Sequence, residues 1–149
     1  MPSLPTLHRA TRLTLVCVSL GLALSIGACN SVKPTKARSE EITMYDFSSD
    51  IRWGEWDAAY DYVDPKTKKE HPLSDIERGR FKQVEISAYE VLANVHHEGT
   101  IDRQIKLDMI NRNTQIPRTV SYIEHWRWDD EIKKWWLVSG LPDISPQGE

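Results

Sequence analysis

Cysteine is scarce in this sequence: the 149 residues include two, Cys17 and Cys29, both in the first fifth of the chain. Cysteines placed there cannot cross-link a domain that follows them, so a disulfide-stapled scaffold is excluded. The sequence also has no zinc-ligand spacing, no glycine-rich phosphate loop and no nucleophile elbow. It therefore fits one ordinary globular domain, and it contains no motif that identifies a particular reaction.

Positive charge is also limited, with 19 Lys and Arg against 22 Asp and Glu. The first 28 residues hold Arg9, Arg12 and no acid, which leaves 17 bases, 22 acids and a net charge of −5 for residues 29–149. Nucleic-acid binding depends largely on neutralising phosphates with clustered bases. An acidic chain without a basic tract is therefore not expected to bind nucleic acid.

The first 28 residues have the pattern of a secretory signal peptide. After the two arginines, residues 13–28 are sixteen uncharged and mostly apolar residues. A membrane-spanning helix needs roughly 20 such residues, and this shorter segment ends in small ones. We therefore predict a signal peptide over residues 1–28.

The end of this segment reads Ile26-Gly27-Ala28-Cys29: an aliphatic residue, two small residues and a cysteine. It resembles the lipobox of bacterial lipoprotein precursors, which implies cleavage before Cys29 and a diacylglyceryl group on its thiol. Asn30, rather than aspartate, follows the cysteine, and this implies outer-membrane sorting with the domain facing the periplasm; the inner membrane is the alternative. A plain signal peptide with an incidental cysteine, or an uncleaved anchor, remains open.

Residues 29–43 are predicted to form a lipidated tether, because they are polar, contain Pro34 and show no apolar periodicity. The domain is then expected over residues 44–145. In its first part, residues 44–63, we expect a helix that begins after cap residues among Ser48, Ser49 and Asp50 and ends at Asp64-Pro65. A charged loop follows, and Ser74 and Glu77 have the spacing of a capping box for a short second helix.

Four strands are expected in the second half of the chain, in the regions 84–95, 101–109, 120–128 and 135–139. The alternation of apolar residues breaks between Ala88 and Leu92, which indicates a β-bulge. Short turns join long strands, so we predict an α+β fold. In it, a helix or helices at the N-terminus pack on a four-stranded antiparallel meander.

Two segments of the chain resemble one family. The start around Trp56-Asp57-Ala58-Ala59-Tyr60 and the aromatic strands of residues 122–142 are similar to the nuclear-transport-factor-like, or cystatin-like, roll. The resemblance implies a curved sheet wrapped around the N-terminal helices. The family includes isomerases, dehydratases and cyclases together with non-catalytic binding and assembly domains, and many members pair as homodimers. The helical part is short here, which predicts a shallow or absent pocket.

Glu124 is the weak catalytic candidate. Strand parity places it on the apolar face between Tyr122 and Trp126, where a desolvated carboxylate could act as a general base. The favoured alternative is a structural ion pair with Arg103, which lies on the same face of the neighbouring strand. No metal site is predicted, because His96 and His97 would point to opposite faces of a strand. No cofactor is expected.

Six tryptophans are many for one small domain. Core packing is expected for most of them, but Trp135, Trp136 and Tyr122 are candidates for a binding surface because aromatic residues are enriched at interfaces.

The sequence thus predicts a membrane-anchored lipoprotein. Its domain would be a non-catalytic binding or assembly module with a protein partner or a second copy of itself. The alternative is a small pocket enzyme of the isomerase or dehydratase type. A closed pocket around Glu124 without Arg103 would favour the enzyme, and a filled core with Trp135 or Trp136 exposed would favour the binding module.

Overall fold

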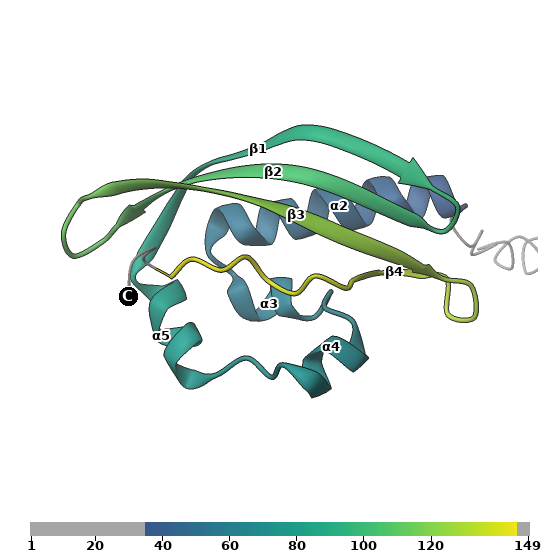
Figure 1. The fold of residues 1–149 in the computed structure, drawn as a ribbon, viewed down its shortest axis with the longest axis horizontal. Coiled ribbons are helices and arrows are strands. Elements are labelled where there is room, and N and C mark those ends of the chain that lie inside the picture. Colours follow the sequence, from purple (N-terminus) through teal and green to yellow (C-terminus); the bar gives the residue numbers. More distant parts are fainter. Residues whose placement is uncertain (1–34, 146–149) are drawn as a thin grey trace, which may run out of the picture. The chain divides into compact units, whose positions relative to one another are not determined.

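The computed structural model describes residues 35–145. Four helices come first (Figure 1): α2 (Lys36–Trp53), α3 (Trp56–Tyr60), α4 (Pro65–Glu70) and α5 (Asp75–Lys82). Four strands follow: β1 (Val84–His97), β2 (Thr100–Asn111), β3 (Pro117–Asp129) and β4 (Lys134–Leu137). The predicted signal peptide over residues 1–28 and the predicted lipidation site Cys29 lie outside the described residues. Within residues 35–145, no helix is both long and apolar enough to span a bilayer.

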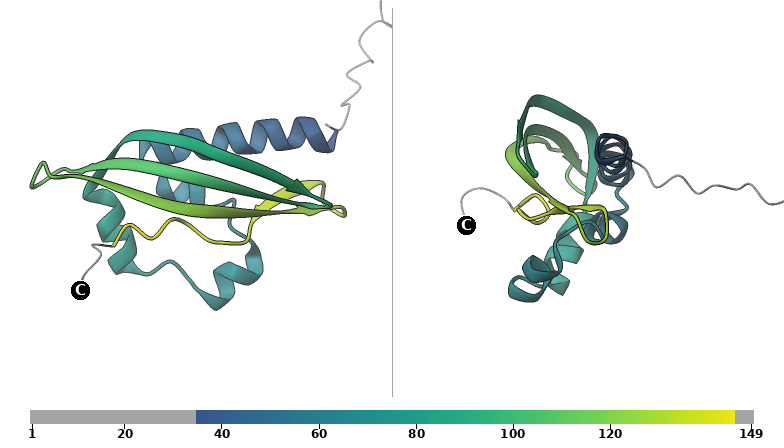
Figure 2. Two further views of the ribbon diagram at one scale, coloured as in Figure 1. Left: turned by 45° about the horizontal axis from the view of Figure 1, so that its top comes forward. Right: turned by 90° about the vertical axis from the view of Figure 1, so that its right-hand side faces the viewer.

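The strands form one antiparallel meander in the order β1-β2-β3-β4. The register between β1 and β2 shifts at Ile86/Ala88 and again at Val91/Ala93, which confirms the irregularity predicted for β1. The long strands curve around the helices (Figures 1 and 2). The α+β fold with helices packed on a four-stranded antiparallel meander is therefore confirmed.

Helix α2 begins at Lys36, well before the cap residues that the sequence indicated. Thr35 caps it by accepting a hydrogen bond from the backbone N–H of Arg38, and Gly54 ends it with a φ of 74°. The tether prediction is therefore wrong from Lys36 onward, and Ser48, Ser49 and Asp50 lie inside the helix rather than at its start. The predicted single helix over residues 44–63 is instead divided at Gly54 into α2 and α3.

Tertiary contacts explain why the polar first turns of α2 are helical. The indole Nε1–H of Trp135 donates to the carbonyl oxygen of Lys36 at 3.4 Å, and the Lys36 ammonium lies 5.3 Å from the centre of the Trp135 ring. Further along, Glu40 contacts His96 of β1 at 2.7 Å. These partners come from the far end of the chain, so no apolar periodicity in residues 36–43 signals the helix.

The core fills the space between α2, α3 and one face of the sheet. Phe47 is fully buried, and its ring meets the ring of Trp126 edge-on, with 5.1 Å between the ring centres. A similar edge contact, with 5.9 Å between the ring centres, joins Phe47 to Tyr62. The other fully buried large side chains include Ile51, Ile101, Ile105, Leu107, Met109, Trp135 and Leu137.

Two short helices, α4 and α5, come between α3 and β1 in the sequence. The predicted capping box is present at α5, where Ser74 and Glu77 exchange side-chain and backbone hydrogen bonds. Residues 65–70, expected to be a loop, form α4 instead. Asp64 caps this helix by accepting from the backbone N–H of Lys66 at 2.8 Å, and Pro65 occupies its first position.

Asp64 should make folding stability depend on pH. Burial raises the pKa of its carboxyl group, but the hydrogen bonds from Arg127 and from the Lys66 N–H outweigh burial, so the net pKa is lowered. A lowered folded-state pKa stabilises the protein above the unfolded value of about 4, and this stabilisation is lost as pH falls through the folded-state value. Asp64→Asn keeps the cap oxygen but removes the charge.

We therefore expect Asp64→Asn to lower the free energy of unfolding at pH 7, with a deficit that shrinks below about pH 4. Urea unfolding of both proteins from pH 3 to pH 7 measures this difference. A deficit that stayed constant with pH would show that the charge of Asp64 is not what stabilises the fold.

Candidate functional site

Glu124 lies on β3 with its side chain completely buried. Register places it opposite Arg103 of β2, and the Arg103 guanidinium donates to Oε2 of Glu124 at 2.9 Å. Both side chains are shielded from solvent, with exposed fractions of 7% for Arg103 and 0% for Glu124. The structure therefore contains the ion pair that strand parity indicated.

Three further donors surround the same carboxylate. The Tyr122 hydroxyl donates to Oε1 at 3.0 Å, the indole Nε1–H of Trp126 donates to Oε2 at 3.0 Å, and the Tyr89 hydroxyl also donates to Oε1. A carboxylate offers about four lone-pair positions. Four donors therefore occupy Glu124, and none of its acceptor capacity remains for a substrate.

The two tyrosines are held as donors. Burial, followed by the negative charge of Glu124, raises the pKa of both Tyr89 and Tyr122 far above the ordinary value. Their hydroxyl groups therefore stay protonated at any physiological pH. The cluster of Tyr89, Arg103, Tyr122, Glu124 and Trp126 is a saturated network, which we call the buried carboxylate network. A fully hydrogen-bonded network of this kind makes the core rigid and specifies one packing of it.

Cavities lie away from this network. One of about 180 Å³ lies between α5, the segment before it and the chain after β4, and its lining includes Tyr60, His71, Arg80, Phe81 and Leu141. A shallower groove between α5 and β3 is lined by Arg80, Val84 and Arg118, among others. Neither Glu124 nor Arg103 lines either hollow. The buried carboxylate network therefore lies apart from both of these hollows.

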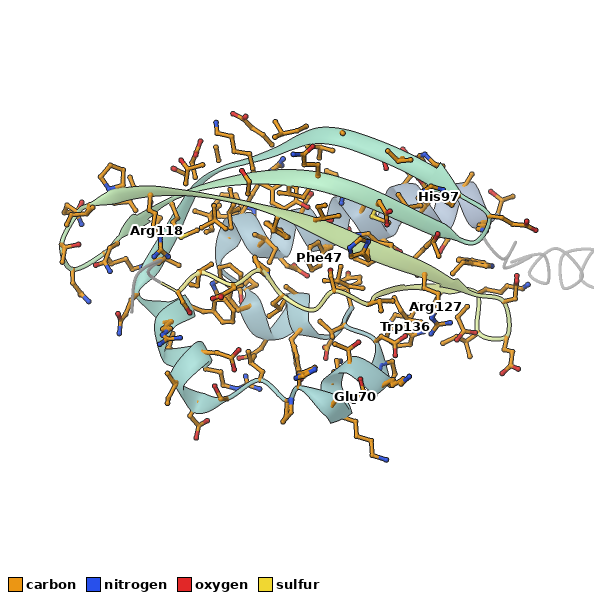
Figure 3. All side chains as sticks on the ribbon, viewed as in Figure 1. Phe47, Glu70, His97, Arg118, Arg127 and Trp136 are labelled. Carbon is orange, nitrogen blue, oxygen red and sulfur yellow. The ribbon has the colours of Figure 1, made fainter. Side chains whose placement is uncertain are left out.

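None of the three aromatic residues predicted for a binding surface is fully exposed. Trp135 is 1% exposed and packs in the core, so it cannot contact a partner directly. Trp136 lies on the opposite face, opposite Arg127 in register (Figure 3). It is half-buried beneath Lys134, whose ammonium is 3.9 Å from the ring centre. Tyr122 belongs to the buried carboxylate network.

The exposed aromatic side chains of the helices are on α2 instead. Trp53 is 79% exposed and Tyr45 is 70% exposed, and Ile42 on the same helix is 42% exposed. With Ser49, these residues follow one another at spacings of three, four and four, so they form one stripe along the helix. We call Ile42, Tyr45, Ser49 and Trp53 the outer face of α2. Once the helix is known to begin at Lys36, this spacing is the sequence signal that identifies it.

The outer face of α2 borders a groove of about 360 Å³ between the helix and β1. Tyr45, Ser49, Arg52 and Trp53 line one side of it, and residues 86–88 of β1 line the other. The Arg52 guanidinium donates to the carbonyl oxygen of Tyr89 at 3.4 Å, and Glu40 contacts His96. These contacts hold α2 along the edge strand, as both views in Figure 2 show.

The histidines near the β1–β2 turn have separate partners. His96 contacts Glu40, whereas His97 and His125 both contact Asp102, at 3.6 Å and 2.7 Å. His96 and His97 therefore do not converge on one point. Within residues 35–145, no group of three histidine, cysteine or acidic side chains is arranged to hold a metal ion.

Solved structures of low sequence identity share this architecture. A SEC-C motif containing protein from Rhodopseudomonas palustris matches with a TM-score of 0.56 and 13% identity over 72% of this chain and 80% of that one. A sec-c motif containing protein from Psychrobacter arcticus matches with a TM-score of 0.51 and 13% identity over 79% of this chain and 67% of that one. Likeness at this identity shows the fold alone.

A protein described as an NTF2-like transpeptidase from Campylobacter jejuni matches with a TM-score of 0.40 and 13% identity, over 66% of this chain and 96% of that one. No family model and no curated protein sequence matches the chain.

Proposed function

We propose that this chain is a membrane-anchored bacterial lipoprotein whose domain is a non-catalytic binding module. The observation that carries the non-catalytic assignment is the saturation of Glu124, the one acid that the sequence offered as a general base. Four donors and complete burial leave it no access to a substrate. The isomerase or dehydratase alternative gains no support from any described residue.

The anchor is the part of the proposal that rests on the sequence. The order of arginines, apolar segment and Ile26-Gly27-Ala28-Cys29 supports lipid attachment at Cys29, and Asn30 supports the periplasmic face of the outer membrane. Each buried methylene of an acyl chain contributes about 0.8 kcal/mol, so several chains hold a protein on a bilayer essentially permanently. The domain then works at a membrane surface rather than free in solution.

The binding role is supported by the exposed outer face of α2. Large aromatic side chains that remain exposed in a folded domain are typical of interaction surfaces, because burying them against a partner removes apolar area from water. The convex face of the sheet carries Asp102, Gln104 and Lys106 of β2, and the large apolar residues exposed beside them, Val95 and Ile123, are aliphatic rather than aromatic. The outer face of α2 is therefore the better candidate for the surface that meets a partner.

Replacing Cys29 tests the anchor directly. We expect Cys29→Ser to abolish incorporation of radioactive palmitate in bacterial cells and to move the protein out of the detergent-extracted membrane fraction, because the thiol that accepts the lipid is gone. Cys17→Ser is the matched control, since Cys17 would be removed with the signal peptide, and it should label normally. Unchanged labelling and membrane retention in Cys29→Ser would overturn the lipoprotein proposal.

A further inference from the structure

We propose that the outer face of α2 rests on the lipid bilayer that holds the anchor, so that the helix lies along the membrane surface. This inference depends on the proposed lipid at Cys29. It names one occupant for the surface formed by Ile42, Tyr45, Ser49 and Trp53, namely the interfacial layer of the membrane.

The side chains of this face suit a bilayer interface. Tryptophan and tyrosine combine an apolar ring with one polar group, and they are enriched at the depth where headgroups meet acyl chains. Trp53 and Tyr45 are the two most exposed aromatic residues in residues 35–145, and Ile42 continues the stripe toward the start of the helix. The stripe runs parallel to the helix axis, so all of its side chains can enter the membrane interface when the helix lies flat on the bilayer.

The length of chain before the helix limits how far the start of α2 can lie from the membrane. Lys36, the first residue of α2, lies seven positions after Cys29. Fully extended, seven residues span at most about 23–25 Å. A helix of 18 residues is about 27 Å long, comparable to the reach of that segment. The domain therefore cannot move far from the bilayer, and the start of α2 is held within about 25 Å of the anchor.

Charge near the outer face indicates what kind of contact this is. Arg38 is paired with Glu41 at 2.8 Å. The exposed Asp46, four positions after Ile42 and seven before Trp53, lies beside the stripe, and Asp50 lies on the same helix. The helix thus lacks the excess of bases that draws amphipathic helices to anionic lipids. We expect the contact to depend on ring insertion, to form on zwitterionic lipid and to respond little to salt.

This contact would fix the orientation of the domain. The anchor supplies most of the affinity, while a stripe of three large side chains prevents the domain from turning freely about its tether. With α2 on the bilayer, the convex face of the sheet remains open to the periplasm.

Tryptophan fluorescence tests the contact, because Trp53 is the exposed one of the six tryptophans and the others are buried or half-buried. The acylated protein is reconstituted in phosphatidylcholine vesicles with or without brominated acyl chains, which quench indoles at the interface. We expect bromine-dependent quenching in the unmodified protein, and Trp53→Phe should lose most of it. Trp136→Phe is the matched control, because Trp136 lies on β4 outside the outer face of α2, and this variant should keep the quenching.

A second pair of variants distinguishes insertion of the outer face of α2 into the bilayer from mere closeness of the domain to the membrane. Tyr45→Asp places a charge in the outer face and should reduce the quenching of Trp53, whereas Ile116→Asp, at a residue 63% exposed near the β2–β3 turn, should not. Circular dichroism confirms that each variant is folded. Equal quenching in Tyr45→Asp and Ile116→Asp, or none in the unmodified protein, would overturn the proposal.

Mass spectrometry and vesicle flotation keep this test independent of the anchor. Protein that carries acyl groups and floats with the vesicles but shows no quenching of Trp53 overturns the orientation and leaves the lipoprotein proposal intact. Protein without acyl groups overturns both. The emission of Trp53 could instead shift without lipid, and more so at higher protein concentration. That result would mean that a second copy of the chain covers the outer face of α2.

Discussion

Arg103→Met is expected to lower the free energy of unfolding by about 3–5 kcal/mol, because it leaves the buried Glu124 carboxylate without a positive partner. Arg103 donates to Glu124 at 2.9 Å, and both side chains are out of contact with water. In the variant, only the neutral donors of Tyr89, Tyr122 and Trp126 remain to offset the cost of burying the charged carboxylate. Urea unfolding at pH 7, followed by tryptophan fluorescence and circular dichroism, measures the loss.

A second substitution distinguishes an uncompensated charge from a packing defect. Adding Glu124→Gln to Arg103→Met removes the negative charge but keeps a side-chain oxygen that can accept from Tyr89 and Tyr122. The double variant should therefore recover much of the lost stability. A loss of about 0–1 kcal/mol in Arg103→Met, the size seen for solvent-exposed pairs, would instead show that water reaches Glu124. That result would reopen the case for chemistry at this carboxylate.

Phe47→Ala is the other large expected effect, at about 3–5 kcal/mol of unfolding free energy. Its ring is fully buried and makes edge contacts with Trp126 and Tyr62, so its removal leaves a cavity where α2 meets the sheet. The same unfolding measurement applies. This variant tests whether α2 is an integral part of the domain rather than a tether.

Tyr45→Ala is the matched control for Phe47→Ala. Tyr45 precedes Phe47 by two positions on the same helix but is 70% exposed, so its removal should change stability by no more than about 0.5 kcal/mol. Equal effects at the two positions would mean that the buried and exposed sides of α2 have been assigned wrongly.

Patterns that repeat along a strand or lie within a few residues were readable from the sequence. Alternation in residues 101–109 identified β2 and its buried face, and the same parity placed Arg103 and Glu124 together on the inner side of neighbouring strands. The capping box at Ser74 and Glu77 needs only a spacing of three. Each of these depends on local backbone geometry, which short sequence windows contain.

Features that depend on distant partners were not readable. The first turns of α2 are stabilised by Trp135 and His96, which lie far away in sequence, and the start of the helix was therefore misplaced. The donors from Tyr89 and Trp126 to Glu124 likewise require knowledge of the packed core.

The sequence by itself determined the α+β meander, the ion pair on its inner face and the expectation of an N-terminal lipid. Tertiary structure alone decided which aromatic residues meet solvent. Helix α2 carries large apolar residues on two sides, Met44, Phe47 and Ile51 on one and Ile42, Tyr45 and Trp53 on the other. Helical spacing treats the two sides alike, and only packing against Trp126 and Tyr62 determines which one is buried.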